Sequence, residues 1–117
     1  MTEDDFLALC LAFPEAVEGF NMGSTFFKAN GKDLARILGG ERAMLTGVPI
    51  EEIEMLVEAE PGTFWADNHY KQAKCLVAHL GPLAPDVARG FLERRFRQVA
   101  KRSVLKAWEQ QLPPSRA

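Results

Sequence analysis

The segment from residue 65 to residue 71 gathers side chains that a small-ligand site needs. Two aromatic rings, a carboxylate, an imidazole and an amine belong to Trp65, Asp67, His69, Tyr70 and Lys71. Aromatic faces stack on flat ligands, and a few polar groups fix the ligand's orientation, so this segment is a candidate ligand site. The alternative is a structural loop, in which the apolar rings fill the core and the polar groups bond the backbone. The structural role is the more common one for such residues.

Basic residues offer a second chemistry, which is contact with phosphate groups. Arg94, Arg97 and Lys101 are spaced three and four apart, so they share one face of a helix. Together with Lys28 and Lys32 in a predicted hairpin, they are the candidate DNA contacts. The alternative is an ordinary solvated helix surface, because long helices commonly carry Arg and Lys on their exposed side.

Charge is divided unevenly along the chain. Residues 82–117 hold eight basic and three acidic residues, a net charge of +5, whereas residues 1–81 have a net charge of -7. The basic part favours binding to a polyanion, and the acidic part opposes it.

Histidines, cysteines and serines do not form a catalytic or metal-binding pattern. His69 and His79 are ten residues apart and lack the i, i+4 spacing of a zinc helix. Cys10 and Cys75 have no C-x-x-C spacing, and Ser24 lies outside any G-x-S-x-G elbow. Glycine-rich segments match neither a P-loop nor a dinucleotide fingerprint. We therefore expect no metal, no cofactor and no catalytic residue.

Length and composition predict one globular domain. The chain has 117 residues, of which 47% are hydrophobic and 26% charged, with a net charge of -2. These values argue against intrinsic disorder. No apolar run reaches the roughly 18 residues that cross a bilayer, and the acidic start does not resemble a secretory signal. We expect a cytoplasmic protein that does not bind membranes.

Hydrophobic periodicity and turn residues predict an α+β domain. An amphipathic pattern after Thr2 and a second one after Pro49 predict helices, and Asn30-Gly31 predicts a type I′ hairpin turn. In chain order we expect a helix over 2–12, an acidic connection over 14–19, a strand over 22–29, a strand around residue 34, a strand over 41–46, a helix over 49–60, an irregular loop over 62–71, a strand over 73–80 and one long helix from 85 to 112.

Four short segments resemble a known family when they are taken in order. They are Phe-Pro-Glu-Ala-Val-Glu at 13–18, Met-Gly at 22–23, Phe-Lys-Ala-Asn-Gly-Lys at 27–32 and Leu-Ala at 34–35. This order resembles the MmcQ/YjbR-like family, and the resemblance covers nearly the whole chain. The sequence departs from the family at Met22, where Trp is frequent, and at Thr25, where Pro is frequent. The last helix also runs further, to Trp108.

The resemblance implies a fold and a functional label. The fold is a curved antiparallel sheet, here a three-strand meander plus a fourth strand, packed with an N-terminal helix, a middle helix and a long C-terminal helix. It is similar to double-wing, frataxin-like and secretion-chaperone-like architectures. Family members are often labelled DNA-binding, and such a label is a weak guide to function. We expect one such domain over 1–112 and a short disordered tail over 113–117.

Three functional hypotheses follow. The first is a non-enzymatic domain that binds DNA through phosphates, with little sequence readout. The second is a protein-interaction adaptor that uses the acidic middle helix and the basic C-terminal helix as opposite poles. The third, which has least support, is a ligand or enzymatic site at residues 65–71. The sequence does not predict an oligomeric state.

Overall fold

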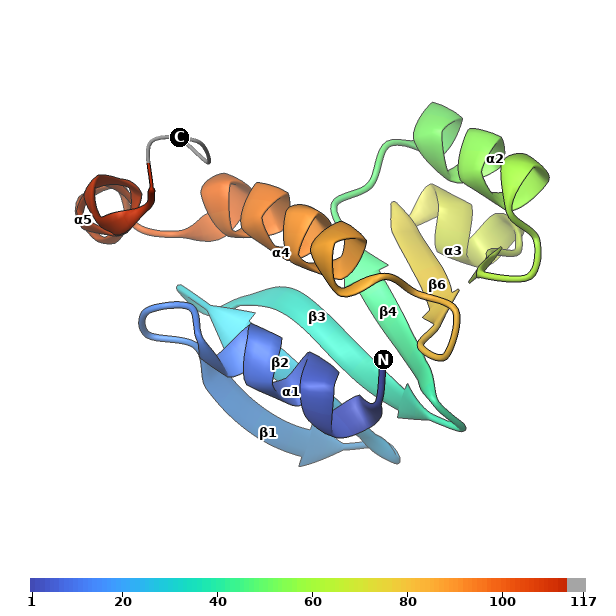
Figure 1. The fold of residues 1–117 in the computed structure, drawn as a ribbon, viewed down its shortest axis with the longest axis horizontal. Coiled ribbons are helices and arrows are strands. Elements are labelled where there is room, and N and C mark those ends of the chain that lie inside the picture. The colour runs from blue at the N-terminus through green and yellow to red at the C-terminus, as the bar shows by residue number, and fades with distance from the viewer. Residues whose placement is uncertain (114–117) are drawn as a thin grey trace.

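The computed structural model describes residues 1–113, and in them six strands form one open antiparallel sheet (Figure 1). The spatial order is β1-β2-β3-β4-β6-β5. The strands are β1 (Val17–Asn21), β2 (Ser24–Ala29), β3 (Lys32–Gly39), β4 (Arg42–Thr46), β5 (Phe64–Trp65) and β6 (Cys75–His79). The predicted α+β class with an antiparallel sheet is confirmed.

Helix α1 (Glu3–Leu11) begins at the predicted capping box. The Asp5 amide donates to Thr2 Oγ1 at 3.1 Å, and the Thr2 amide donates to Asp5 Oδ2 at 2.9 Å. These bonds satisfy amides that a helix start leaves unpaired. Phe6 and Cys10 lie on one side of the helix and are fully buried against the sheet.

Two tight turns build the first half of the sheet. Asn30 and Gly31 have φ values of 55° and 74°, as the predicted type I′ turn requires. Met22 and Gly23, at 50° and 78°, form a second such turn between β1 and β2. Strand β1 therefore occupies part of the predicted acidic connection, and the meander has four strands instead of three. Strand β1 is an edge strand with little buried surface, so it lacks the alternation of apolar and polar residues that would predict a strand, and it carries the polar Glu18.

The core lies between the sheet and the helices α1 and α4 (Pro85–Val99) (Figure 1). One cross-strand row on this face runs through Phe27, Ala35, Leu45 and Leu76, all of them 0 or 1% exposed. Helix α4 packs on β3 and β4 above this row. Register shifts in β2–β3 and β3–β4 mark bulges, which bend the sheet around the core.

The remaining helices refine the predicted elements. Helix α2 (Ile50–Ala59) confirms the predicted middle helix, with Ile53 fully buried. The predicted irregular loop contains β5 and the short helix α3 (Asn68–Gln72). No helix within residues 1–113 is long and apolar enough to cross a membrane.

The predicted long C-terminal helix is divided into α4 and α5 (Arg102–Gln111). Ala100 and Lys101 are extended, with ψ values of 148° and 143°. Two contacts explain the break. The Asn30 side-chain amide donates a hydrogen bond to the Val99 carbonyl oxygen, which a continuous helix would use for its own backbone. The change of direction at Ala100 and Lys101 also allows Trp108 of α5 to pack on Phe13. Of the predicted tail over 113–117, residues 114–117 lie outside the described part of the chain.

Candidate nucleic-acid interface

The β2–β3 turn docks on the end of α4. Asn30 Nδ2 donates to the Val99 carbonyl oxygen at 2.9 Å, which joins residues 69 positions apart. A shallow hollow beside this bond is lined by Asn30, Glu15 and Lys101, among others. Because Lys32 follows the same turn, Lys32 and Lys101 belong to one end of the molecule. This end, formed by the β2–β3 turn and the α4–α5 junction, is called the junction surface below.

Cations at the junction surface form no close ion pairs within the described residues, although Glu15 lies beside Lys101 and Glu109 beside Lys106. Within residues 1–113, none of the ion pairs includes Lys32, Lys101, Arg102 or Lys106. All four side chains are exposed. An exposed and unpaired cation keeps its full charge available for an incoming phosphate, which makes this surface the strongest candidate for a polyanion.

Arg94 and Arg97 are held by contacts within the protein. Arg94 Nη2 lies 3.0 Å from Glu52 Oε2 on α2, and its guanidinium lies 5.1 Å from the Phe91 ring centre. Arg97 Nε lies 3.8 Å from Glu109 Oε2 on α5, and its guanidinium lies 5.0 Å from the Trp108 ring centre. Both residues therefore join helices together, and the basic strip expected on one helix is interrupted at Ala100.

Lys28 lies on the other side of the sheet. Its ammonium is 5.1 Å from the centre of the Phe26 ring, and Phe26 faces away from the core that contains Phe27. Arg36 flanks the same ring at 5.7 Å. Lys32 thus follows the turn that is bonded to Val99, and Lys101 caps α5 just after Val99, whereas Lys28 contacts Phe26 on the outer face of the sheet and Arg94 contacts α2.

The residues of the candidate ligand segment make local contacts. Asp67 caps α3 by accepting the Tyr70 amide at 2.9 Å, and Lys71 Nζ lies 3.5 Å from Glu54 Oε2. The Tyr70 ring stands edge-on to Trp65 at 5.6 Å and to His69 at 6.0 Å. Trp65 does not fill the core, since it is 45% exposed on the outer side of β5. Most of these groups already have structural partners.

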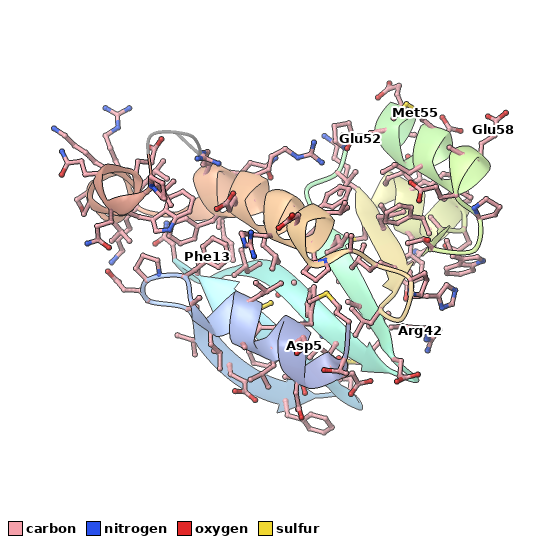
Figure 2. All side chains as sticks on the ribbon, viewed as in Figure 1. Asp5, Phe13, Arg42, Glu52, Met55 and Glu58 are labelled. Atoms are coloured by element: carbon pink, nitrogen blue, oxygen red, sulfur yellow. The ribbon has the colours of Figure 1, made fainter. Side chains whose placement is uncertain are left out.

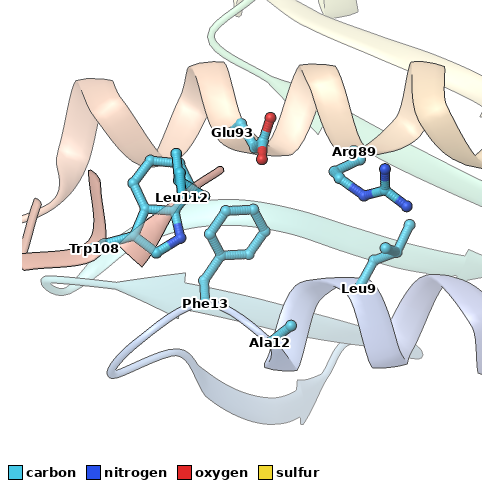
Figure 3. Close-up of a pocket in the computed structure, with 7 residues that line it drawn as sticks. All are labelled: Leu9, Ala12, Phe13, Arg89, Glu93, Trp108 and Leu112. Atoms are coloured by element: carbon cyan, nitrogen blue, oxygen red, sulfur yellow. The ribbon is translucent and has the colours of Figure 1, made fainter. Parts of the chain in front are cut away.

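A pocket that the sequence did not indicate lies between α1, α4 and α5 (Figure 3). Its volume is about 220 Å³, and Phe13 and Trp108 form its aromatic wall. Arg89 and Glu93 of α4 also line it, and Arg89 Nη1 pairs with Asp86 at 3.0 Å. Residues near both ends of the sequence line the pocket, so no local sequence motif could have indicated it.

The two thiols are poor nucleophiles. Burial raises the pKa of Cys10 far above its ordinary value. Burial also raises the pKa of Cys75, and the Asp33 carboxylate adds to this increase. A thiol with a raised pKa stays protonated at neutral pH and reacts slowly. Among the described residues, no group of three His, Cys, Asp or Glu side chains could hold a metal ion.

Comparison with known proteins supports the fold. No protein-family model matches the sequence, and no curated protein matches it. The crystal structure of the Deinococcus radiodurans protein DR2400, a DUF419 domain, is similar with a TM-score of 0.68. The two chains are 24% identical, and the match covers 96% of this chain and 89% of that chain. DUF419 is related to the MmcQ/YjbR family, so the resemblance is supported at the level of the fold.

Proposed function

We propose that this domain is a non-enzymatic DNA-binding protein that contacts phosphates through the junction surface. Lys32 and Lys101 are the central contacts, and Arg102 and Lys106 of α5 extend the surface. The observation that carries the proposal is the 2.9 Å bond from Asn30 to Val99, because it holds the hairpin turn against the end of α4, next to Lys101.

The distribution of charge supports this choice of surface. Helices α2 and α5 lie at opposite ends of the molecule (Figure 1). Helix α2 exposes Glu51, Glu54 and Glu58, and Glu58 and Met55 project from it in Figure 2. An approaching polyanion is repelled by the α2 end and attracted to the α5 end, so the field orients it toward the junction surface.

The expected mode of binding is insensitive to sequence. Lysine ammonium groups act on phosphates as point charges, and phosphate contacts carry no direct sequence information. We therefore expect similar affinity for duplexes of different sequence and a strong decrease of affinity with salt.

The test is fluorescence anisotropy with a mixed-sequence duplex at two or more salt concentrations. The double variant Lys32→Glu with Lys101→Glu removes two proposed contacts. Its slope of log affinity against log salt should fall by about 2, and its affinity should fall for every sequence alike. The matched control is Arg42→Glu with Lys74→Glu, which makes the same change of charge at exposed residues outside the junction surface. Figure 2 shows Arg42 far from α5.

Two results would overturn the proposal. One is an absence of duplex binding at low salt, where the attraction of phosphates is strongest. The other is an equal loss of affinity in both double variants, which would show that only net charge matters.

A second candidate function is the protein-interaction adaptor, and the exposure of Met55 between the α2 carboxylates favours it. Met55 is 58% exposed, and apolar side chains of this size at the surface often anchor a partner. A basic, partly apolar partner helix would fit this side of α2. Binding of such a partner that is lost in Met55→Glu and kept in Lys32→Glu would support the adaptor.

A further inference from the structure

Strand β1 is an unprotected edge of the sheet. The sheet ends at β1 on one side and at β5 on the other. Strand β5 has only two residues and packs against α2, so that edge offers little backbone for pairing. Strand β1 has five residues, and its pairing within residues 1–113 is with β2 alone. Each molecule therefore has one edge that can accept another strand.

Side chains along β1 offer little of the protection that usually blocks edge pairing. Residues 17–23 contain no Lys, Arg or Pro, and Glu18 is their single charged residue. Three apolar side chains are instead strongly exposed there. The exposed fractions are 59% for Val17, 71% for Phe20 and 97% for Met22. Val17 and Phe20 point to opposite faces of the strand, so exposed apolar side chains flank the open edge on both faces of the sheet.

The turn geometry tells which backbone groups of β1 face outward. In a two-residue type I′ hairpin, the pair that flanks the turn exchanges hydrogen bonds, and this pair is Asn21 with Ser24. Hydrogen-bonded and non-bonded pairs then alternate, so Val17 and Gly19 also bond to β2. The N–H and C=O groups of Glu18 and Phe20 consequently point away from the sheet.

We propose that β1 is a homodimer interface, in which β1 of a second copy pairs with it antiparallel around Gly19. In this register Glu18 of each copy lies opposite Phe20 of the other. The outward N–H and C=O groups of Glu18 and Phe20 in each copy are then all hydrogen-bonded to the other copy. The register that places Glu18 opposite Glu18 is disfavoured, because like charges directly opposite each other repel. Since each molecule has one open edge, pairing closes a two-fold dimer and stops.

Side-chain packing suits this arrangement. Gly19 at the axis has no side chain, and the Phe26 ring covers its outer side, since a Cβ there would lie 2.1 Å from Phe26 Cζ. The axis pair is a non-bonded pair, in which the two strands approach most closely, at about 4.5 Å between Cα atoms. Phe20 of each copy would pack across the boundary beside the aliphatic part of Glu18.

The experiment combines molar mass with amide exchange measured residue by residue. Light scattering should show a mass that rises from monomer to dimer with concentration. In the monomer, the amides of residues 17, 19 and 21 are protected and those of 18 and 20 exchange freely. In the dimer, exchange at 18 and 20 should slow by at least about tenfold. Phe20→Lys should remain monomeric, whereas the matched control Val87→Lys, at an exposed residue of α4, should still dimerise.

Several outcomes would refute the dimer. A monomeric mass at every concentration with rapid exchange at residues 18 and 20 is one. A dimer that persists in Phe20→Lys with these amides unprotected would place the interface elsewhere. Protection that arises only after cell extract is added, with a monomeric mass in the pure protein, would instead assign the edge to an extended peptide.

Discussion

Asn30 connects the hairpin turn to the C-terminal half of the chain, and its replacement tests this link directly. The residue has two roles. Its side chain donates a hydrogen bond to the Val99 carbonyl oxygen at 2.9 Å, and its backbone adopts a left-handed conformation with φ of 55°. Asn tolerates this conformation better than most residues, and Gly tolerates it best. The variants Asn30→Ala and Asn30→Gly therefore separate the two roles.

The expected magnitudes follow from the geometry. Loss of a partly buried hydrogen bond costs about 1 kcal/mol, and both variants lose it. Ala adds about 1 kcal/mol for a left-handed conformation, so Asn30→Ala should lose about 2 kcal/mol and Asn30→Gly about 1 kcal/mol. For a chain of this size, each kcal/mol corresponds to about 4 °C in Tm.

Urea unfolding followed by circular dichroism measures both values. Equal stability of Asn30→Gly and the unmodified protein would show that the bond to Val99 contributes nothing. Equal destabilisation by Ala and Gly would show that the turn carries no backbone penalty. The first result would refute the energetic link between the turn and α4 through Asn30, and the second would refute the conformational part of the expected loss.

Two further predictions concern the ends of the structure. Trp108→Ala should destabilise the protein by about 3 to 5 kcal/mol, because the buried Trp108 ring centre lies 5.0 Å from that of Phe96 and 5.7 Å from that of Phe13. Thermal unfolding measures the loss, and the control Trp65→Ala, which removes an exposed ring, should cost far less. Hydrogen bonds with the Thr2 backbone and side chain lower the pKa of Asp5, so the Asp5 carboxylate stabilises the fold fully above the ordinary Asp pKa, and this contribution is lost as pH falls through the lowered pKa. Urea unfolding at several acidic pH values should therefore show a weaker loss of stability with falling pH in Asp5→Asn than in the unmodified protein.

Local sequence signals predicted the elements whose causes are local. Thr2 and Asp5 are three residues apart, and Asn30-Gly31 is a complete turn signal, so α1 and the β2–β3 turn were predictable. The Met22-Gly23 turn was missed because Met rarely adopts a positive φ. Strand β1 was missed with it, since an edge strand takes its conformation from its neighbour.

The α4–α5 break and the Arg94–Glu52 contact could not be predicted from the sequence, because both depend on residues far apart in the chain. Ala100, Lys101 and Arg102 are good helix formers, and their local pattern favours one continuous helix. The break depends on Asn30, which is far away in the chain. The contact between Arg94 and Glu52 has a similar origin, because the two residues meet only in the folded protein.

The order of synthesis gives the α4–sheet packing a consequence for folding in the cell. The meander β1–β4 is contiguous and its turns are short, so it can form soon after residue 46 is made. Its inner row, with Phe27 and Leu45, is covered by α4, which is made after β6. Before α4 is made, a ribosome-bound chain therefore presents an apolar sheet face that only α1 can cover, together with the open β1 edge, and such exposure favours aggregation or chaperone binding.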